Sequence, residues 1–159
     1  MNILLVEDDA VTRRVLISQL KKLGHVVTEA EDGVEGFARF QEIQPQVLIT
    51  DWMMPNMDGP TLCRKIREEK TKEYTFIIIL TALEKKIGYT EGMKAGADDF
   101  MTKPADIVEL NVRLRVAERI VRLQKEVQQL KGLLPICSKC KRIRVADERW
   151  EQVESYITK

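Results

Sequence analysis

Residues 47–60 read VLITDWMMPNMDGP, and this stretch holds the pattern that decides the fold. It begins with a short apolar run, Val47–Thr50, passes through an acidic residue and a turn, and reaches Gly59-Pro60, a pair typical of a helix start. A continuous apolar run of this length predicts a strand buried on both faces. The stretch therefore predicts one strand–loop–helix unit.

Units of the same kind surround this one, so that five are expected in all. The expected strands are Ile3–Val6, Val26–Ala30, Val47–Thr50, Phe76–Leu80 and Asp99–Thr102. Helices are expected over residues 10–23, 33–44, 59–67, 84–95 and from about 105 onward; in the first, Val11, Val15, Ile17 and Leu20 recur at helical spacing. This alternation predicts an α/β fold in which helices cover both faces of a parallel sheet.

The last helix is expected to run from about Ala105 to Lys131, a stretch without Gly or Pro. Apolar residues on it and just beyond it alternate in steps of four and three: Val116, Ile120, Leu123, Val127, Leu130 and Leu134. This pattern favours a two-stranded coiled coil over packing on the chain's own sheet. We expect three parts: a domain over residues 1–120, a helical stalk over 121–134 and a small tail over 135–159.

The composition indicates a globular protein with one core of ordinary size. The chain has 159 residues, of which 44% are hydrophobic and 32% charged. Its longest strongly apolar run, Phe76–Leu80, is far shorter than the ~20 residues of a membrane helix, and no basic leader opens the sequence, so we expect a cytoplasmic protein without a membrane partner. Residues 1–106 hold 14 Lys/Arg and 18 Asp/Glu, whereas residues 107–159 hold 12 and 7.

The functional residues are expected just after the strands, because ligands of a doubly wound sheet bind at the carboxyl ends of its strands. The residues at these places are Glu7, Asp8, Asp9, Asp51, Thr81, Ala82 and Lys103. Like charges crowded at one edge favour a bound cation, and hard oxygen ligands favour Mg²⁺. Beside such a cation, Asp51 is placed to accept a phosphoryl group whose oxygens Thr81 and Lys103 hold. Helix capping is the alternative for single acids such as Asp8, Asp9 and Asp58.

Four motifs resemble those of a known family. VEDDAVTRR at 6–14, DWMMPNMDG at 51–59, LTA at 80–82 and DDFMTKP at 98–104 resemble the receiver domain of bacterial two-component response regulators. The resemblance covers residues 1 to about 120 and implies a flavodoxin-like (βα)5 fold with a five-stranded parallel sheet. It also implies a signalling module rather than an enzyme, phosphorylated by a sensor histidine kinase or a phosphotransfer protein.

The resemblance assigns a role to each site residue. It makes Asp51 the phospho-acceptor, and it makes Glu7, Asp8, Asp51 and the backbone carbonyl of Met53 the ligands of Mg²⁺ or Mn²⁺. It makes Thr81 the switch hydroxyl, Phe100 the switch aromatic and Lys103 the contact of the phosphoryl group. Thr81 and Phe100 are expected to move inward after phosphorylation. The resemblance places the last helix on the output face, and this helix continues as the stalk. A homodimer is expected to form through it, and phosphorylation is expected to change how the two stalks pair.

The tail allows several interpretations. Cys137 and Cys140 form half of a four-ligand Zn²⁺ site. We favour a truncated site over one completed across a dimer, and two thiols without a metal stay a third interpretation. Trp150, Val153 and Ile157 lie at helical spacing and predict an amphipathic last helix. The tail is basic, but it contains no recognisable helix-turn-helix, so nucleic-acid binding is disfavoured.

Two other functions stay open. A phosphohydrolase of the aspartyl-phosphate type would also use an Asp nucleophile, but its signature places a second Asp two residues later, where this chain has Met53. A phosphorylation-independent interaction module with a nucleic-acid-binding tail is the other alternative. Loss of the acceptor, the acid pair or the lysine would mark such a module, and the chain retains all of these residues.

Overall fold

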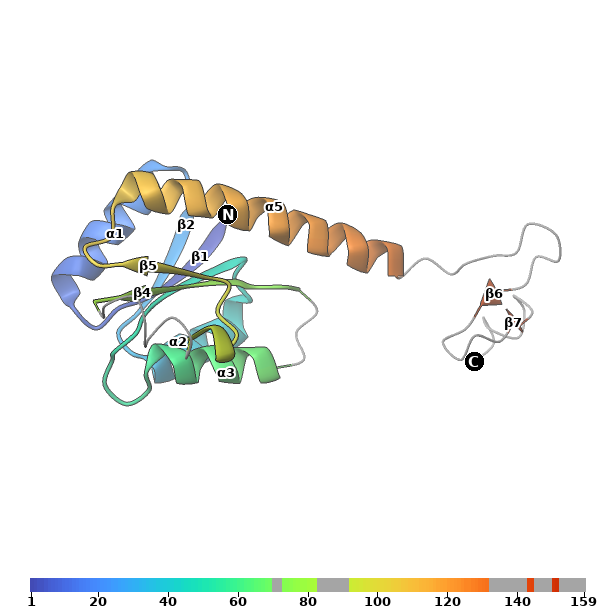
Figure 1. Ribbon diagram of the computed structural model, residues 1–159, viewed down its shortest axis with the longest axis horizontal. Coiled ribbons are helices and arrows are strands. Elements are labelled where there is room, and N and C mark those ends of the chain that lie inside the picture. Colours follow the sequence, from blue (N-terminus) through green and yellow to red (C-terminus); the bar gives the residue numbers. More distant parts are fainter. Residues whose placement is uncertain (70–72, 83–91, 132–142, 145–149, 152–159) are drawn as a thin grey trace. The chain divides into compact units, whose positions relative to one another are not determined.

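Five parallel strands form one sheet in the order β2-β1-β3-β4-β5 (Figure 1). They are β1 (Asn2–Val6), β2 (Val26–Ala30), β3 (Val47–Asp51), β4 (Phe76–Thr81) and β5 (Asp99–Thr102). Each expected strand is confirmed to within one residue at either end. The extra residues at the ends of β3 and β4 are Asp51 and Thr81, which are therefore held by the sheet itself. This is the flavodoxin-like strand order that the resemblance implied.

The computed structural model describes residues 1–69, 73–82, 92–131, 143–144 and 150–151. The described helices with assigned bounds are α1 (Ala10–Lys22), α2 (Gly33–Ile43), α3 (Gly59–Glu68) and α5 (Ile107–Lys131). Most of the helix expected over 84–95 lies outside the described residues. The described helices are not long and apolar enough for any of them to cross a membrane.

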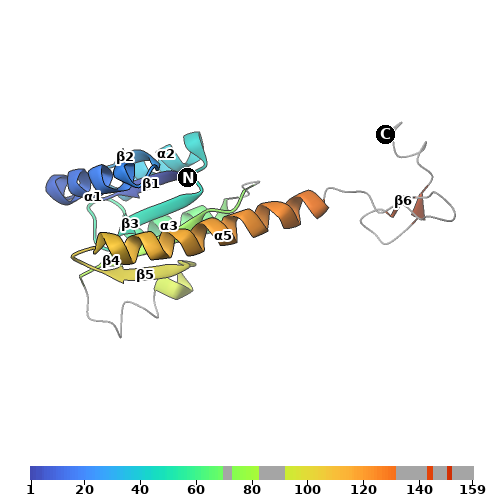
Figure 2. The same ribbon diagram turned by 90° about the horizontal axis from the view of Figure 1, so that it is seen from above.

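The helices pack on both faces of the sheet, α1 and α5 on one and α2 and α3 on the other (Figures 1 and 2). Because successive side chains of a strand point to opposite faces, Ile3 and Leu5 of β1 join the α1/α5 core, while Leu4 and Val6 join the α2/α3 core. All four side chains are fully buried. Both faces of the sheet are therefore covered, as the continuous apolar strands predicted.

Aspartates cap the four helices whose bounds are given, including α5, where Asp106 accepts hydrogen bonds from N–H groups of the first turn. Asp9 accepts a hydrogen bond from the Thr12 N–H at the start of α1, and Asp58 accepts one from the Thr61 N–H at the start of α3. At the start of α2, Asp32 accepts hydrogen bonds from the N–H groups of the second and third residues of the helix. The capping interpretation is therefore right for Asp9 and Asp58. The capping residue of α1 is Asp9 rather than Asp8, so Asp8 is left for another role.

The buried face of α1 differs from the one that its valines define. Val11 is 70% exposed and Val15 49% exposed, whereas Arg13, Leu16 and Leu20 are buried. The last three positions are spaced by three and four residues, so they form the stripe that packs on the sheet. Of the four apolar residues expected at helical spacing, Leu20 is buried and Ile17 packs against the core, so the prediction is right for these two and wrong for the two valines.

The C-terminal part of the chain is a separate unit. The chain divides into Met1–Leu123 and Gln124–Lys159, which differs slightly from the expected boundary at residue 120. In the second unit, β6 (Ile143–Arg144) pairs antiparallel with β7 (Trp150–Glu151). The helix expected to begin at Trp150 is wrong at that residue, because three apolar positions are too few to separate a helix from a strand. Residues 152–159 lie outside the described residues, as do Cys137 and Cys140.

Candidate functional site

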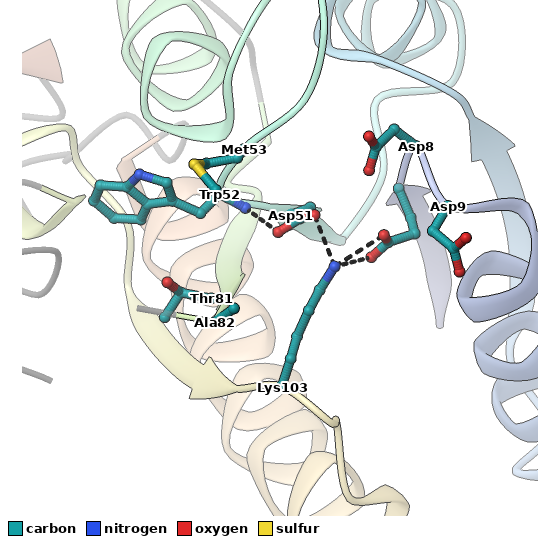
Figure 3. A pocket seen from close by; sticks show the side chains of 9 residues that line it. Asp8, Asp9, Asp51, Trp52, Met53, Thr81, Ala82 and Lys103 are labelled. Atoms are coloured by element: carbon teal, nitrogen blue, oxygen red, sulfur yellow. Dashed lines mark hydrogen bonds and ion pairs between the residues drawn. The ribbon is translucent and has the colours of Figure 1, made fainter. Parts of the chain in front are cut away.

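The carboxyl ends of four strands meet at one pocket (Figure 3). Its lining residues are Glu7, Asp8, Asp9, Asp51, Trp52, Met53, Thr81, Ala82 and Lys103. Seven of the nine are the strand-end residues selected from the sequence, and Met53 was expected through its carbonyl group. The structure therefore brings together the residues that lie up to 96 positions apart in the chain.

Three consecutive acids after β1 have three different environments. The Glu7 N–H donates to the Ala30 carbonyl at 3.2 Å, which continues the β1–β2 pairing, and the Glu7 residue is fully buried. Asp8 is exposed at the pocket. The Oδ1 atom of Asp9 accepts the Thr12 N–H at 2.7 Å and caps α1. Glu7 and Asp8 thus remain the acids available to a ligand.

Asp51 is fixed by the backbone around it. It is 9% exposed, and its Oδ1 accepts the Trp52 N–H at 2.6 Å. The chain then turns sharply into α3, where the Gly59 N–H donates to the Trp52 carbonyl at 2.9 Å. A Cβ atom at Gly59 would collide with the backbone oxygen of Asp51, so the close return of the chain requires glycine here.

Lys103 joins the acids of two strands (Figure 3). Its Nζ lies 2.7 Å from Asp51 Oδ2, 2.8 Å from Glu7 Oε1 and 2.7 Å from Glu7 Oε2. Burial alone would lower the pKa of Lys103, but the hydrogen bonds to Asp51 and Glu7 raise it. Burial raises the pKa of Glu7, the charge of Asp51 adds to that rise, and Lys103 opposes it. The ammonium stays charged, while the buried Glu7 carboxylate is disfavoured in its charged form.

The acids fit a small divalent cation. Glu7, Asp8 and Asp51 each offer a carboxylate oxygen, and these oxygens lie within 4.8 Å of one another. Glu7 Oε2 is buried and accepts no hydrogen bond from the described residues, although the Lys103 charge lies beside it. Three carboxylates face one ammonium, so a hard cation would balance the excess negative charge, and Glu7 Oε2 could serve as one of its ligands.

Of the two expected switch residues, Thr81 lines the pocket and Phe100 packs against Trp52. Thr81, at the end of β4, is 7% exposed and lines the pocket. Phe100 on β5 is 8% exposed, and its ring lies 6.4 Å from that of Trp52 at an interplanar angle of 47°. Gly92 packs so closely that an added Cβ would collide with the Phe100 ring. The Phe100 ring is therefore packed between Trp52 and Gly92 in this structure.

Sequence reasoning missed Trp52 and Arg13. Trp52 is 9% exposed, lines the pocket and donates its backbone N–H to Asp51. Its position directly after Asp51 was a signal that could have been used. Arg13 lies within the first motif, and it donates to the Glu7 carbonyl at 2.7 Å. Its burial on α1 could not be read from an apolar pattern.

Comparisons with known proteins agree with this geometry. Residues 3–115 match the family described as response regulator receiver domain. The transcriptional regulatory protein CseB of Streptomyces coelicolor is 39% identical over 118 residues, which cover 74% of this chain and 49% of CseB. Response regulator PleD of Caulobacter vibrioides is 35% identical over 127 residues, covering 80% of this chain and 28% of PleD. The chain thus spans about half of CseB and less of PleD.

A solved structure shares the architecture. The receiver domain of the Francisella response regulator 1452 superposes with a TM-score of 0.69 at 32% sequence identity. The match covers 74% of this chain and 96% of the Francisella chain. The similarity therefore extends over nearly the whole of that receiver domain.

Proposed function

The chain belongs to the response regulator receiver domain family, and from this premise we propose that Asp51 accepts a phosphoryl group and thereby switches the chain between signalling states. As in other response regulators, the donor is a histidine kinase or a phosphotransfer protein. The observation that carries the proposal is the convergence of Asp51, Lys103 and the buried Glu7 at one point, with Lys103 Nζ 2.7 Å from Asp51 Oδ2.

The transfer step uses the Asp51 carboxylate as nucleophile. One of its oxygens forms a bond to phosphorus while the bond from phosphorus to the donor's histidine nitrogen breaks, and the imidazole leaves with the electron pair and takes up a proton. The Trp52 N–H holds Oδ1 and Lys103 holds Oδ2, so the carboxylate is oriented before the donor arrives. Orientation of this kind lowers the entropic part of the barrier.

Glu7, Asp8, Asp51 and the Met53 carbonyl are the residues that would hold Mg²⁺ or Mn²⁺. The bound cation supplies positive charge against which the phosphoryl oxygens and the carboxylates can approach. Lys103 contributes the second positive charge of the pocket. Its ammonium bridges both acids, so it can move from the carboxylate oxygens to a phosphoryl oxygen without a large displacement.

The switch follows from new acceptors at the site. A phosphoryl group on Asp51 carries close to two negative charges and strong acceptor oxygens, which favour conformations that bring Thr81 and Lys103 to it. These interactions exist in one state only, and such a difference is what shifts a conformational equilibrium. Because Phe100 is already buried against Trp52, we place the change at Thr81 and Lys103 rather than at the Phe100 ring.

The test is covalent labelling with acetyl phosphate, a small phosphodonor, in the presence of Mg²⁺. Asp51→Asn is expected to lose the label completely, because the amide of asparagine does not attack acetyl phosphate as a carboxylate does. Asp9→Asn is the matched control, since it changes an acid that lines the same pocket while asparagine caps α1 equally well. Mass spectrometry of the intact chain measures the +80 Da adduct that one phosphoryl group adds. Persistent labelling of Asp51→Asn would remove the assignment.

For the remaining chain we propose a receiver over residues 1–120, a stalk over 121–134 and a tail over 135–159. The stalk pairs with that of a second copy. The support is that Leu123 and Val127 of the apolar stripe are 49% and 45% exposed, so the described residues of this chain leave about half of each side chain uncovered. For the tail, the zinc half-site formed by Cys137 and Cys140 stays a prediction.

A further inference from the structure

Arg13 is a buried charged residue just outside the pocket. It lies on α1 on the face that packs on the sheet, it is 7% exposed, and it does not line the pocket. Buried guanidinium groups persist only where their donors are used and their charge is balanced. The partners of Arg13 therefore indicate what the residue does.

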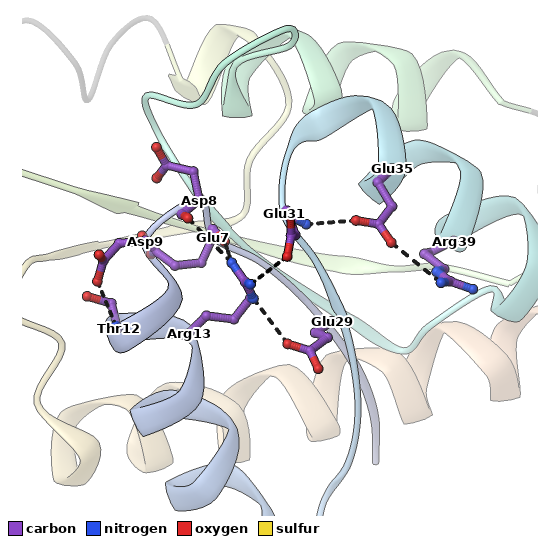
Figure 4. A network of polar contacts seen from close by, with 9 residues as sticks. All are labelled: Glu7, Asp8, Asp9, Thr12, Arg13, Glu29, Glu31, Glu35 and Arg39. Carbon is purple, nitrogen blue, oxygen red and sulfur yellow. Dashed lines mark hydrogen bonds and ion pairs between the residues drawn. The ribbon is translucent and has the colours of Figure 1, made fainter.

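Each nitrogen of the guanidinium group has an acceptor (Figure 4). Nη1 donates to the Glu7 carbonyl at 2.7 Å and makes a longer contact to the Asp8 carbonyl at 3.4 Å. On the other side, Nε donates to Glu29 at 3.1 Å and Nη2 to Glu31 at 2.8 Å. Arg13 thus links the loop after β1 to the end of β2.

The bond to the Glu7 carbonyl acts on two acids at once. That carbonyl belongs to the peptide group between Glu7 and Asp8, which is planar and includes the Cα atoms of both residues. The Glu7 and Asp8 side chains are attached to the Cα atoms at the two ends of this plane. A hydrogen bond to the carbonyl oxygen therefore fixes the orientation of the plane and, with it, the directions of both side chains. The Glu7 side chain reaches Lys103 from this plane, and the Asp8 carboxylate lies near those of Glu7 and Asp51.

The effect of Arg13 on the pocket is positional rather than electrostatic. Glu29 and Glu31 pair with the guanidinium group outside the pocket, and their side chains are 57% and 73% exposed. Two carboxylates therefore balance its single charge. Exposed partners of this kind contribute little stability by themselves, but they hold the guanidinium fork in one orientation.

We propose that Arg13 is a positioning residue for the divalent-cation site, because it holds the Glu7–Asp8 peptide group so that both carboxylates face Asp51. This inference rests on the proposed function, since it takes Glu7, Asp8 and Asp51 as the cation ligands. Groups that orient metal ligands without touching the metal typically change metal affinity by roughly 10- to 100-fold when they are removed. We expect an effect of that size here.

The experiment measures the Kd of Mg²⁺ for Arg13→Lys and Arg13→Met. Arg13→Lys keeps a charge and a similar stem but has all its donors on one nitrogen, so it lacks the planar fork whose three nitrogens reach the carbonyl and both carboxylates. Arg14→Met is the matched control, because Arg14 is the next residue of α1 and is exposed. The chain has two tryptophans, Trp52 and Trp150. All variants and the parent carry Trp150→Phe, so that the fluorescence signal comes from Trp52, which lines the pocket and can report Mg²⁺ binding.

The titrations are run at a temperature where circular dichroism shows every variant folded, and Mg²⁺-induced rises in melting temperature give a second readout. Arg13→Lys is expected to bind Mg²⁺ roughly tenfold more weakly, Arg13→Met more weakly still, and Arg14→Met like the parent. A purely structural role would lower the melting temperature without changing the Kd of the folded protein. If Arg13→Met does not fold, Arg13→Lys alone decides.

Two failures remain distinguishable. A parent chain that shows neither a fluorescence change nor a rise in melting temperature with Mg²⁺ lacks the cation site of the proposed function, and this inference then fails with it. A parent that binds Mg²⁺ while both folded Arg13 variants bind it equally well overturns the role of Arg13 alone.

Discussion

Glu7 is the acid at the site whose charge is most costly to the fold. It is fully buried, and burial raises its pKa above the ordinary 4.5 even though Lys103 lies beside it. With Asp8 and Asp51 close by, the pocket holds more negative than positive charge. The same arrangement that suits a cation therefore destabilises the chain when no cation is bound.

Glu7→Gln is expected to stabilise the chain in the absence of divalent cations at pH 7.5, by on the order of 1 kcal/mol. Since the folded-state pKa of Glu7 is raised, the full difference from wild type is present above that pKa and vanishes once the pH falls below 4.5. Urea unfolding with EDTA at several pH values measures it. Asp9→Asn should show no such gain, since hydrogen bonds from Thr12 lower the pKa of Asp9. A less stable Glu7→Gln at pH 7.5 would contradict the interpretation.

The sequence was sufficient to predict Glu7, Asp51, Thr81 and Lys103, because each ends or directly follows a strand and parallel strands end at one edge. Arg13 could not be found in that way. Its role depends on which face of α1 turns to the sheet, and that choice is made by packing in three dimensions. The burial of Phe100 likewise depends on contacts with Trp52 and Gly92 from other parts of the chain.

Among the elements, the connection from β3 to α3 holds the acceptor most directly. Gly59→Ala is expected to destabilise the chain by about 1 to 3 kcal/mol, because its Cβ would collide with the Asp51 backbone oxygen and displace either Asp51 or α3. It should also slow labelling by acetyl phosphate in the fraction that stays folded. Gly24→Ala is the control: its φ of +85° makes alanine strained, but an added Cβ there has nothing within 4 Å. Equal labelling rates in the two variants would show that Gly59 does not position the acceptor.

At the opposite end of the sheet, Arg67 of α3 ties together the loops before β4 and β5. Its side chain donates to the Thr75 carbonyl and the Gly96 carbonyl, each at 2.8 Å, and to Asp98 at 2.6 Å. Asp98 also accepts the Ile77 N–H at 2.7 Å and a hydrogen bond from the Tyr74 hydroxyl. Burial, with the bond to Asp98, raises the pKa of Tyr74 to about 12.

Arg67→Met is therefore expected to lower the free energy of unfolding by about 2 to 4 kcal/mol, because it removes the charge partner of Asp98 and the side-chain donor of two carbonyl groups. Arg64→Met, which changes an exposed arginine on the same helix, should stay within about 0.5 kcal/mol of wild type. Urea unfolding measures both. Labelling of folded Arg67→Met should be unchanged because the residue is remote from the pocket, and a loss of labelling without a loss of stability would contradict this division.

The elements themselves were predicted well where one physical effect dominates. Continuous apolar runs such as Phe76–Leu80 favour a strand covered on both faces, and β3 and β4 are buried along their whole length, whereas the edge strand β2 is mostly half-buried or exposed. The pairing of Trp150–Glu151 with Ile143–Arg144 joins two strands of two residues each, which are too short to show an alternating apolar pattern in the sequence. For α1, Leu20 and Ile17 were found at helical spacing, but the burial of the charged Arg13 could not be predicted from apolar residues.

For the whole molecule, α5 presents two different apolar stripes. Leu110, Leu114, Ala117 and Val121 are buried against the sheet, whereas Val116, Leu123 and Val127 are 45–49% exposed. Ile120 is partly buried against the core. Packing of the a/d stripe on the chain's own sheet was the competing interpretation, and it does not account for these exposed side chains. The exposed stripe is the one that a second copy of the helix would cover.

The proposed stalk pairing predicts that Val127→Glu shifts the full chain toward monomer, because a carboxylate at an a/d position would have to be buried without a partner. The fold of the receiver should be unaffected, since Val127 is 45% exposed. Gln128→Glu adds the same charge at the next residue, which is exposed and off the stripe, and should leave the association unchanged. Sedimentation velocity over a range of concentrations, with and without beryllofluoride and Mg²⁺, measures the mass and its response to the phosphoryl mimic. If wild type and Val127→Glu sediment alike under both conditions, the stripe does not pair two chains, and the signal must leave the receiver through another face.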